Sequence, residues 1–164
     1  MINHHPSAHR LTEYAAGTLS QGPALCISSP LEYCPQCCHT LETLNRVGAE
    51  LMTSEPAAEL STDLFNKVLN RLDNQNLSTT KASHESALSH FIPQGLKNIS
   101  WKRLIGSVST FDLGKDAKDF GIKLMKVRAG RGVFAHTHSH TEFTVLLQGG
   151  YSEEWGNYRK GDFI

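Results

Sequence analysis

Three thiols and an imidazole lie together in the stretch YCPQCCH, residues 33–39. Cys34 and Cys37 have the C-x-x-C spacing, with which one turn of backbone directs two thiolates at one metal ion. A closed tetrahedral zinc site needs four ligands, so this stretch supplies half of one. Two other interpretations are small buried apolar side chains without metal and a redox pair. A thioredoxin-like pair is disfavoured because no βαβ pattern surrounds the motif.

A second group of metal-ligating side chains lies in GRGVFAHTHSHTEFTVLLQGG, residues 130–150. If this segment is extended, strand alternation places His136, His138, His140 and Glu142 on one face. Three imidazoles and a carboxylate suit zinc, iron, nickel or manganese. The alternative interpretation is a solvated polar end of a strand.

The cysteine stretch lies in a segment, residues 7–74, whose apolar periodicity is typical of helices. Ser7 is the expected N-cap of the first helix, and Pro30 is an awkward residue inside the second. The predicted helices cover residues 7–19, 22–33, 38–52 and 61–72. Four short amphipathic helices suit an open bundle or a surface that wraps a partner.

Beyond the helices the pattern changes. Residues 75–90 are polar and poor in large apolar side chains, which predicts a flexible linker. The predicted strands that follow lie in residues 101–113, 120–130 and 141–155, with glycines between them. We therefore expect a helical domain over 1–74, the linker over 75–90, and an all-β domain over 91–164.

Composition excludes several classes of protein. The 164 residues include 16 basic and 16 acidic side chains, so no excess of positive charge favours nucleic acid or an anionic membrane. No apolar run reaches the roughly 20 residues of a membrane span. The N-terminus lacks the apolar core of a signal peptide, which predicts a cytoplasmic protein. In that reducing compartment, four clustered cysteines indicate metal or redox chemistry rather than disulfides.

The histidine-rich segment resembles the first motif of the cupin fold. The motif residues are Gly130, His136, His138, Glu142 and Gly149, at the spacing typical of that motif. The resemblance implies a jelly-roll barrel in which His136, His138 and Glu142 bind a divalent metal, with zinc as the expected ion.

Cupins take a further histidine ligand from a second motif, whose opening resembles KGDFI at residues 160–164. That histidine does not occur in the sequence, so we expect the cupin to be incomplete, with His140 as a candidate substitute.

The helical half resembles the N-terminal domain of the ChrR-type zinc-binding anti-sigma factors, in which this domain precedes a cupin. YAAGTLS at 14–20 and LEYCPQC at 31–37 carry the resemblance. The implied fold has two domains: an N-terminal all-α small helical bundle and a C-terminal all-β cupin (jelly-roll barrel).

This resemblance also implies zinc ligands. They are His5, with His4 as the adjacent alternative, together with Cys34 and Cys37. A fourth family ligand, a histidine, falls on Pro30, so the fourth position needs a substitute. The first candidate for this position is Cys38, which is the nearest thiol. The other candidates are Cys26, His9, His39 and water.

In function, the resemblance implies an anti-sigma factor that inhibits an extracytoplasmic-function sigma factor without contacting nucleic acid or membrane. The cupin would sense oxidants such as singlet oxygen and cause release of the sigma factor. One alternative is a metal-dependent cupin enzyme, an oxygenase or isomerase, although no further catalytic constellation is evident. Another is a redox regulator that switches through Cys34, Cys37 and Cys38.

Overall fold

The N-terminal half of the chain is helical, as predicted. The computed structural model describes residues 2–74, 86–115, 121–133 and 141–164. Its α-helices are α1 (Ala8–Ala15), α2 (Gln21–Leu31), α3 (Pro35–Ser54) and α4 (Leu64–Asn74). The predicted cap is confirmed, because the Ser7 Oγ accepts the Arg10 N–H at 3.3 Å at the start of α1.

The C-terminal half contains short 3-10 helices and antiparallel strands. Helices η1 (Ala87–His90) and η2 (Leu96–Asn98) precede the strands. The strands are β1 (Lys102–Ile105), β2 (Val108–Lys115), β3 (Gly121–Val127), β4 (Gly150–Glu153) and β5 (Gly156–Arg159). They form a three-stranded sheet of order β1-β2-β3 and a separate β4–β5 hairpin. Most of the strand predicted over 141–155 is irregular, with an isolated bridge between Val145 and Phe163.

One apolar core joins the two halves of the sequence. Leu25 of α2 belongs to the same buried cluster as residues of η1, of the segments around η2 and of β3. These partners of Leu25 are Leu88, Ile92, Ile99, Ile122 and Leu124. Each fully buried aliphatic side chain contributes about 1.5–3 kcal/mol relative to an exposed one. The sheet therefore stabilises the helices, and the helices stabilise the sheet.

The expected fold of an all-α bundle and a separate, incomplete cupin barrel is wrong. The described residues form four helices with one three-stranded and one two-stranded antiparallel sheet, and they close no barrel. Neither half covers its own apolar surface: Leu25 needs β3, and Ile2 packs against the turn at Gly161. Periodicity reports that a residue is buried but not which segment buries it, so the two halves were separated too sharply.

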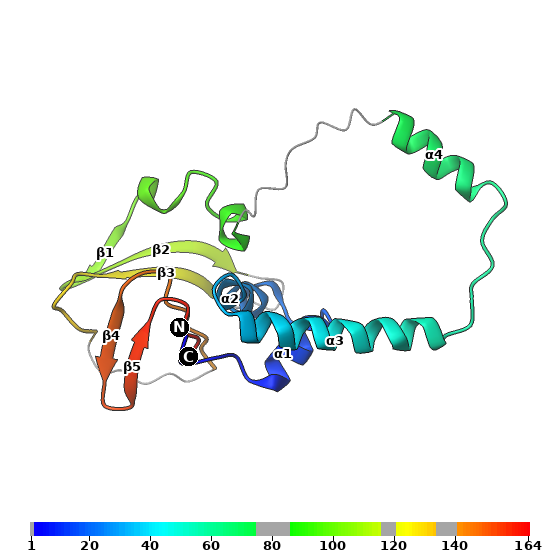
Figure 1. Cartoon of the computed structure of the whole chain (residues 1–164). Helices are drawn as coiled ribbons and strands as arrows, with labels where there is room; N and C mark the ends of the chain where they lie inside the picture. The colour runs from blue at the N-terminus through cyan, green and yellow to red at the C-terminus, as the bar shows by residue number, and fades with distance from the viewer. Residues whose placement is uncertain (1, 75–85, 116–120, 134–140) are drawn as a thin grey trace.

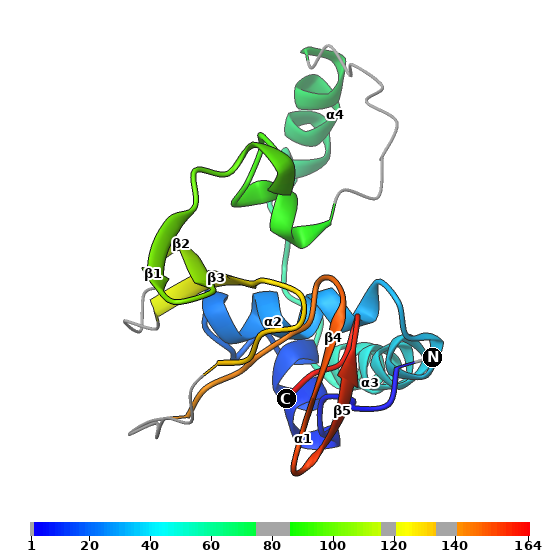
Figure 2. The same cartoon turned by 90° about the vertical axis from the view of Figure 1, so that its left-hand side faces the viewer.

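The outer half of α3 and all of α4 leave this shared core. Figure 1 and Figure 2 show α4 set apart from the other helices, at the end of a long connection from α3. From Leu64 to Leu72, where burial is described, no residue of α4 is buried, although the helix is amphipathic. The exposed apolar side chains of this region are Val47, Leu51, Met52, Leu60, Leu64, Phe65, Val68, Leu69 and Leu72.

The predicted linker over 75–90 ends in ordered structure. Helix η1 lies in its last part, and Leu88 is buried against α2. Within the described ranges, no helix combines the length and the apolar character that a membrane span requires.

Candidate metal centre

The first turn of α3 places two cysteine thiols side by side. Cys34 is the N-cap of the helix, in an extended conformation, and Pro35 follows at the first helical position. The Cys34 Sγ accepts the Cys37 N–H at 3.4 Å, as an N-cap side chain does. The C-x-x-C spacing therefore caps the N-terminus of α3 and directs both thiols to the same side.

His5 completes a group of three ligand atoms. Its Nδ1 lies 3.3 Å from the Cys37 Sγ and 3.3 Å from the Cys34 Sγ. The three atoms lie within 4.8 Å of one another and could hold a metal ion. Nitrogen and sulfur atoms bound to tetrahedral zinc at about 2.1–2.3 Å lie roughly 3.4–3.8 Å apart, so this donor set fits zinc.

Burial makes the site unfavourable for bare thiolates. Cys34 and Cys37 are 5% and 2% exposed. Burial, the hydrogen bond to Cys34 and the negative charges of Cys34 and Cys38 together raise the pKa of Cys37 to about 12. A divalent cation reverses this balance, because coordination deprotonates thiols. A cation beside Cys37 would therefore favour its thiolate form.

The two remaining thiols are turned away from this group. Cys38 Sγ donates to the Leu31 carbonyl at 3.0 Å, and Cys26 Sγ lies 3.9 Å from the Phe143 carbonyl. Loss of contact with water raises the pKa of Cys26 to about 11, so this half-buried thiol is protonated. Pro30, at the place of the expected fourth ligand, is fully buried in α2 and offers no side-chain donor.

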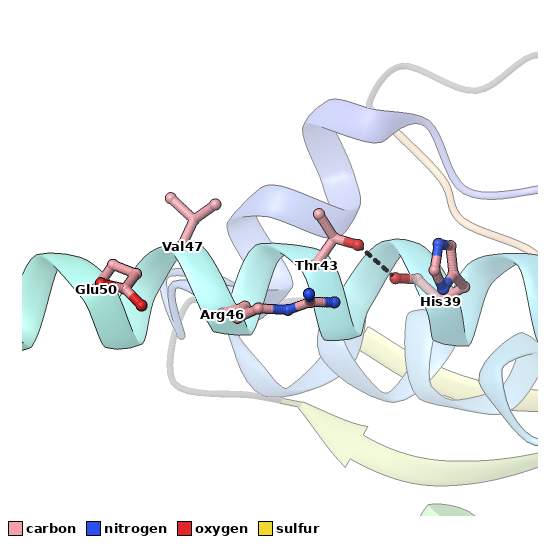
Figure 3. A pocket seen from close by; sticks show the side chains of 5 residues that line it. All are labelled: His39, Thr43, Arg46, Val47 and Glu50. Atoms are coloured by element: carbon pink, nitrogen blue, oxygen red, sulfur yellow. Dashed lines mark hydrogen bonds between the residues drawn. The ribbon is translucent and has the colours of Figure 1, made fainter.

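The candidate histidines also lie outside this group of three ligand atoms. The His4 ring packs on Tyr158 with centroids 4.5 Å apart, and His9 Nε2 lies 3.7 Å from Glu13 Oε1. His39 lines a shallow groove on α3 with four neighbours, as Figure 3 shows. These neighbours are Thr43, Arg46, Val47 and Glu50. Among the described residues, three ligands therefore converge, and water is the candidate for the fourth position.

The second predicted metal site is not tested by the structure. His136, His138 and the candidate substitute His140 lie outside the described residues. Glu142 is exposed, and its Oε1 accepts the Thr144 hydroxyl at 3.4 Å. A metal bound by His136, His138 and Glu142 stays a prediction.

Sequence reasoning missed the residue that holds the His5 segment in place. The carboxylate of Asp162 is fully buried and accepts backbone N–H groups from Asn3 at 2.8 Å and His4 at 3.2 Å. Only the position of Asp162 in KGDFI drew attention to it, for a different reason. No sequence signal pairs residues 158 or more positions apart.

Comparison with known proteins places these features in a family. No protein-family model matches the chain. The chain is 30% identical over 166 residues to the anti-sigma-E factor ChrR of Cereibacter sphaeroides, covering 98% of this chain and 78% of that protein. It also resembles a chain in the crystal structure of Rhodobacter sphaeroides SigE in complex with the anti-sigma ChrR. This match has a TM-score of 0.87 and 29% identity, and it covers 100% of this chain and 86% of the other.

Proposed function

The chain belongs to the family of the anti-sigma factor ChrR, and from this premise we propose that it binds and inhibits a sigma factor of the extracytoplasmic-function class. The observation that carries the proposal is the agreement along the whole chain with a ChrR structure solved in complex with SigE. Agreement of this extent includes both the helical half and the strands, so it concerns the whole arrangement rather than one motif.

The exposed apolar faces of α3 and α4 supply the docking surface. On α4, Phe65 is 71% exposed, and on α3, Met52 is 78% exposed. Exposed apolar faces rimmed by polar residues typically mark sites of protein interaction. An amphipathic helix that lays its apolar face into a groove is a recurring mode of protein recognition. A sigma factor would supply that groove.

The metal in this account is zinc, held by His5, Cys34 and Cys37. It would join the N-terminal segment to the start of α3 and so fix the base from which α3 projects. Since the small helical unit buries few side chains, a metal of this kind would contribute directly to its folding. This role is structural, which agrees with a regulator and requires no catalysis.

Release under oxidative stress is the regulatory part of the proposal. The C-terminal half, residues 86–164, would respond to an oxidant of the singlet-oxygen type and cause release of the sigma factor. Contacts between this half and the segment before His5 would transmit a change in the C-terminal half to the metal centre. The enzyme alternative rests on His136, His138 and Glu142, and no specific observation in the described residues favours it.

A promoter assay tests the proposal. The full chain is co-expressed with an extracytoplasmic-function sigma factor from the same genome, and a reporter follows transcription from that factor's promoter. We expect the reporter to be repressed by the wild type and by Asn66→Asp on the polar face of α4, but not by Phe65→Asp on its apolar face. Unchanged transcription beside a soluble, folded wild-type chain would contradict the proposal.

A further inference from the structure

Asp162 is a fully buried carboxylate with a complete set of backbone donors. Its Oδ1 accepts the N–H groups of Asn3 and His4, and its Oδ2 accepts the Arg159 N–H at 2.9 Å. One oxygen therefore serves the N-terminal segment, and the other closes the turn that follows β5. A buried acceptor with three donors is costly to remove, because each donor is left unpaired away from water.

The segment before His5 is held along its whole length by this turn. Besides the two N–H groups bound to Asp162, the His4 carbonyl accepts the Phe163 N–H at 2.9 Å. A methyl group at Gly161, where φ is +91°, would lie 2.8 Å from Ile2 Cδ1, so Ile2 fits closely against the bare glycine. The backbone of His4 is thus fixed on both sides.

The same turn also contacts the segment that carries the thiols. Lys160 Nζ lies 4.3 Å from the centroid of the Tyr33 ring, and Tyr33 directly precedes Cys34. Ile2 in turn belongs to one buried cluster with Cys34 and Cys37. The turn over residues 159–162 therefore contacts the neighbours of both ligand-bearing segments, which are far apart in the sequence.

From these contacts we propose that Asp162 is a positioning residue for the metal ligand His5, and that it couples the metal centre to the C-terminal half. Ordering backbone residues costs conformational entropy, which is why the hydrogen bonds to Asp162 matter for metal binding by His5. His5 meets the thiols only if the preceding residues are ordered, and Asp162 orders them. The inference deepens the proposed metal site and depends on it.

The main test compares Asp162→Ala with wild type in the full chain loaded with zinc. Loss of a residue that orients a metal ligand typically costs ~10–100-fold in metal affinity, so we expect a chelator to remove zinc about 10-fold faster from the variant. Asp112→Ala is the matched control. The Asp112 carboxylate also accepts a backbone N–H, from Gly114 at 2.8 Å, but it is exposed on β2. Zinc release from Asp112→Ala should equal that of the wild type.

A double-mutant cycle separates positioning from general destabilisation. If Asp162 acts through His5, adding Asp162→Ala to His5→Ala should change zinc release by less than about 2-fold, because the ligand it positions is already gone. In the cobalt-substituted protein, Asp162→Ala should show the ligand-field bands of His5→Ala, while the thiolate-to-cobalt charge-transfer bands remain. Additive effects in the cycle would overturn the inference.

Hydrogen exchange provides a reading that does not depend on metal. The amides of Asn3 and His4 should exchange slowly in the wild type and much faster in Asp162→Ala. If that variant does not fold, Asp162→Asn replaces it. The asparagine side chain keeps only one acceptor oxygen, so the backbone amides of Asn3 and His4 should exchange at an intermediate rate. Zinc bound by the wild type and released equally fast from the variant would overturn this inference alone. A folded wild type that binds no zinc would overturn both the metal site and the inference.

Discussion

Helices α1 and α2 and the start of α3 bury apolar side chains within the described chain, whereas the outer half of α3 and α4 leave theirs exposed. Leu11 of α1 is 4% exposed, whereas Leu51 near the end of α3 is 64% exposed. The first group is held by the sheet, by the N-terminal segment and by three convergent ligand atoms. The second has no such support. The difference separates the part of the chain that folds on itself from the part prepared for a partner.

The largest effect should come from a metal ligand, because it breaks the self-contained region. We expect Cys37→Ser to abolish zinc binding and to loosen α1 and α3, since structural zinc contributes about 10–16 kcal/mol of apparent binding energy in zinc-finger peptides. Zinc content and far-ultraviolet circular dichroism of the purified chain measure both changes. Helix content and zinc at wild-type levels would remove the metal from this account.

A buried leucine tests the same region without touching the metal. Leu11→Ala should lower the free energy of unfolding by about 2–5 kcal/mol, as expected when a large buried side chain is truncated. Urea unfolding followed by circular dichroism measures this change. Without urea, and at a temperature where the variant is folded, its affinity for the sigma factor should stay near that of the wild type.

The exposed region should give the opposite pattern. Leu51→Asp should leave the free energy of unfolding within about 0.5 kcal/mol of wild type, since it replaces an exposed side chain. It should weaken sigma-factor binding by roughly 30-fold or more, the result of losing about 2 kcal/mol at an interface hot spot. Titration calorimetry measures the affinity. If Leu51→Asp destabilises the chain and leaves binding unchanged, the comparison between the two regions fails.

Restoring a fourth ligand should have a smaller effect. In Pro30→His, an imidazole one turn before Cys34 could take the position left to water, so a chelator should remove zinc more slowly than from the wild type. Pro30→Ala is the matched control, because it relieves the proline without adding a donor. Equal release from the two variants would mean that position 30 does not reach the metal.

The smallest effect is expected at the third thiol. Cys38 Sγ donates to the Leu31 carbonyl rather than to the ligand group, and a serine hydroxyl can make the same hydrogen bond. Cys38→Ser should therefore release zinc at nearly the wild-type rate. A large acceleration would identify Cys38 as the substitute ligand after all.

Local features of the fold were predictable from the sequence. Ser7 before an apolar stripe indicates the start of α1, and the spacing of Leu64, Val68 and Leu72 indicates α4, because capping and periodicity are properties of neighbouring residues. The contact of Leu25 with β3 was not predictable, since nothing local to either segment specifies it. The two halves were predicted as separate domains because no local sequence signal indicates this contact.

The candidate site shows the same division. The C-x-x-C spacing predicts that Cys34 and Cys37 lie together, because both belong to one helical turn. That His5 joins them came from a family resemblance rather than from the residues, which lie 29 and 32 positions away. The buried carboxylate of Asp162 carries no local signal, so its contact with the His5 segment became evident only in the folded chain.

The most direct measurement of the central claim is hydrogen exchange of the full chain with and without its sigma factor. The account predicts that the partner slows amide exchange mainly in the outer half of α3, residues 47–54, and in α4, residues 64–74. Residues 34–40 at the metal centre should already be protected in the free chain. Protection confined to the strands, with α4 exchanging as fast in the complex as alone, would contradict the claim that this exposed region binds the sigma factor.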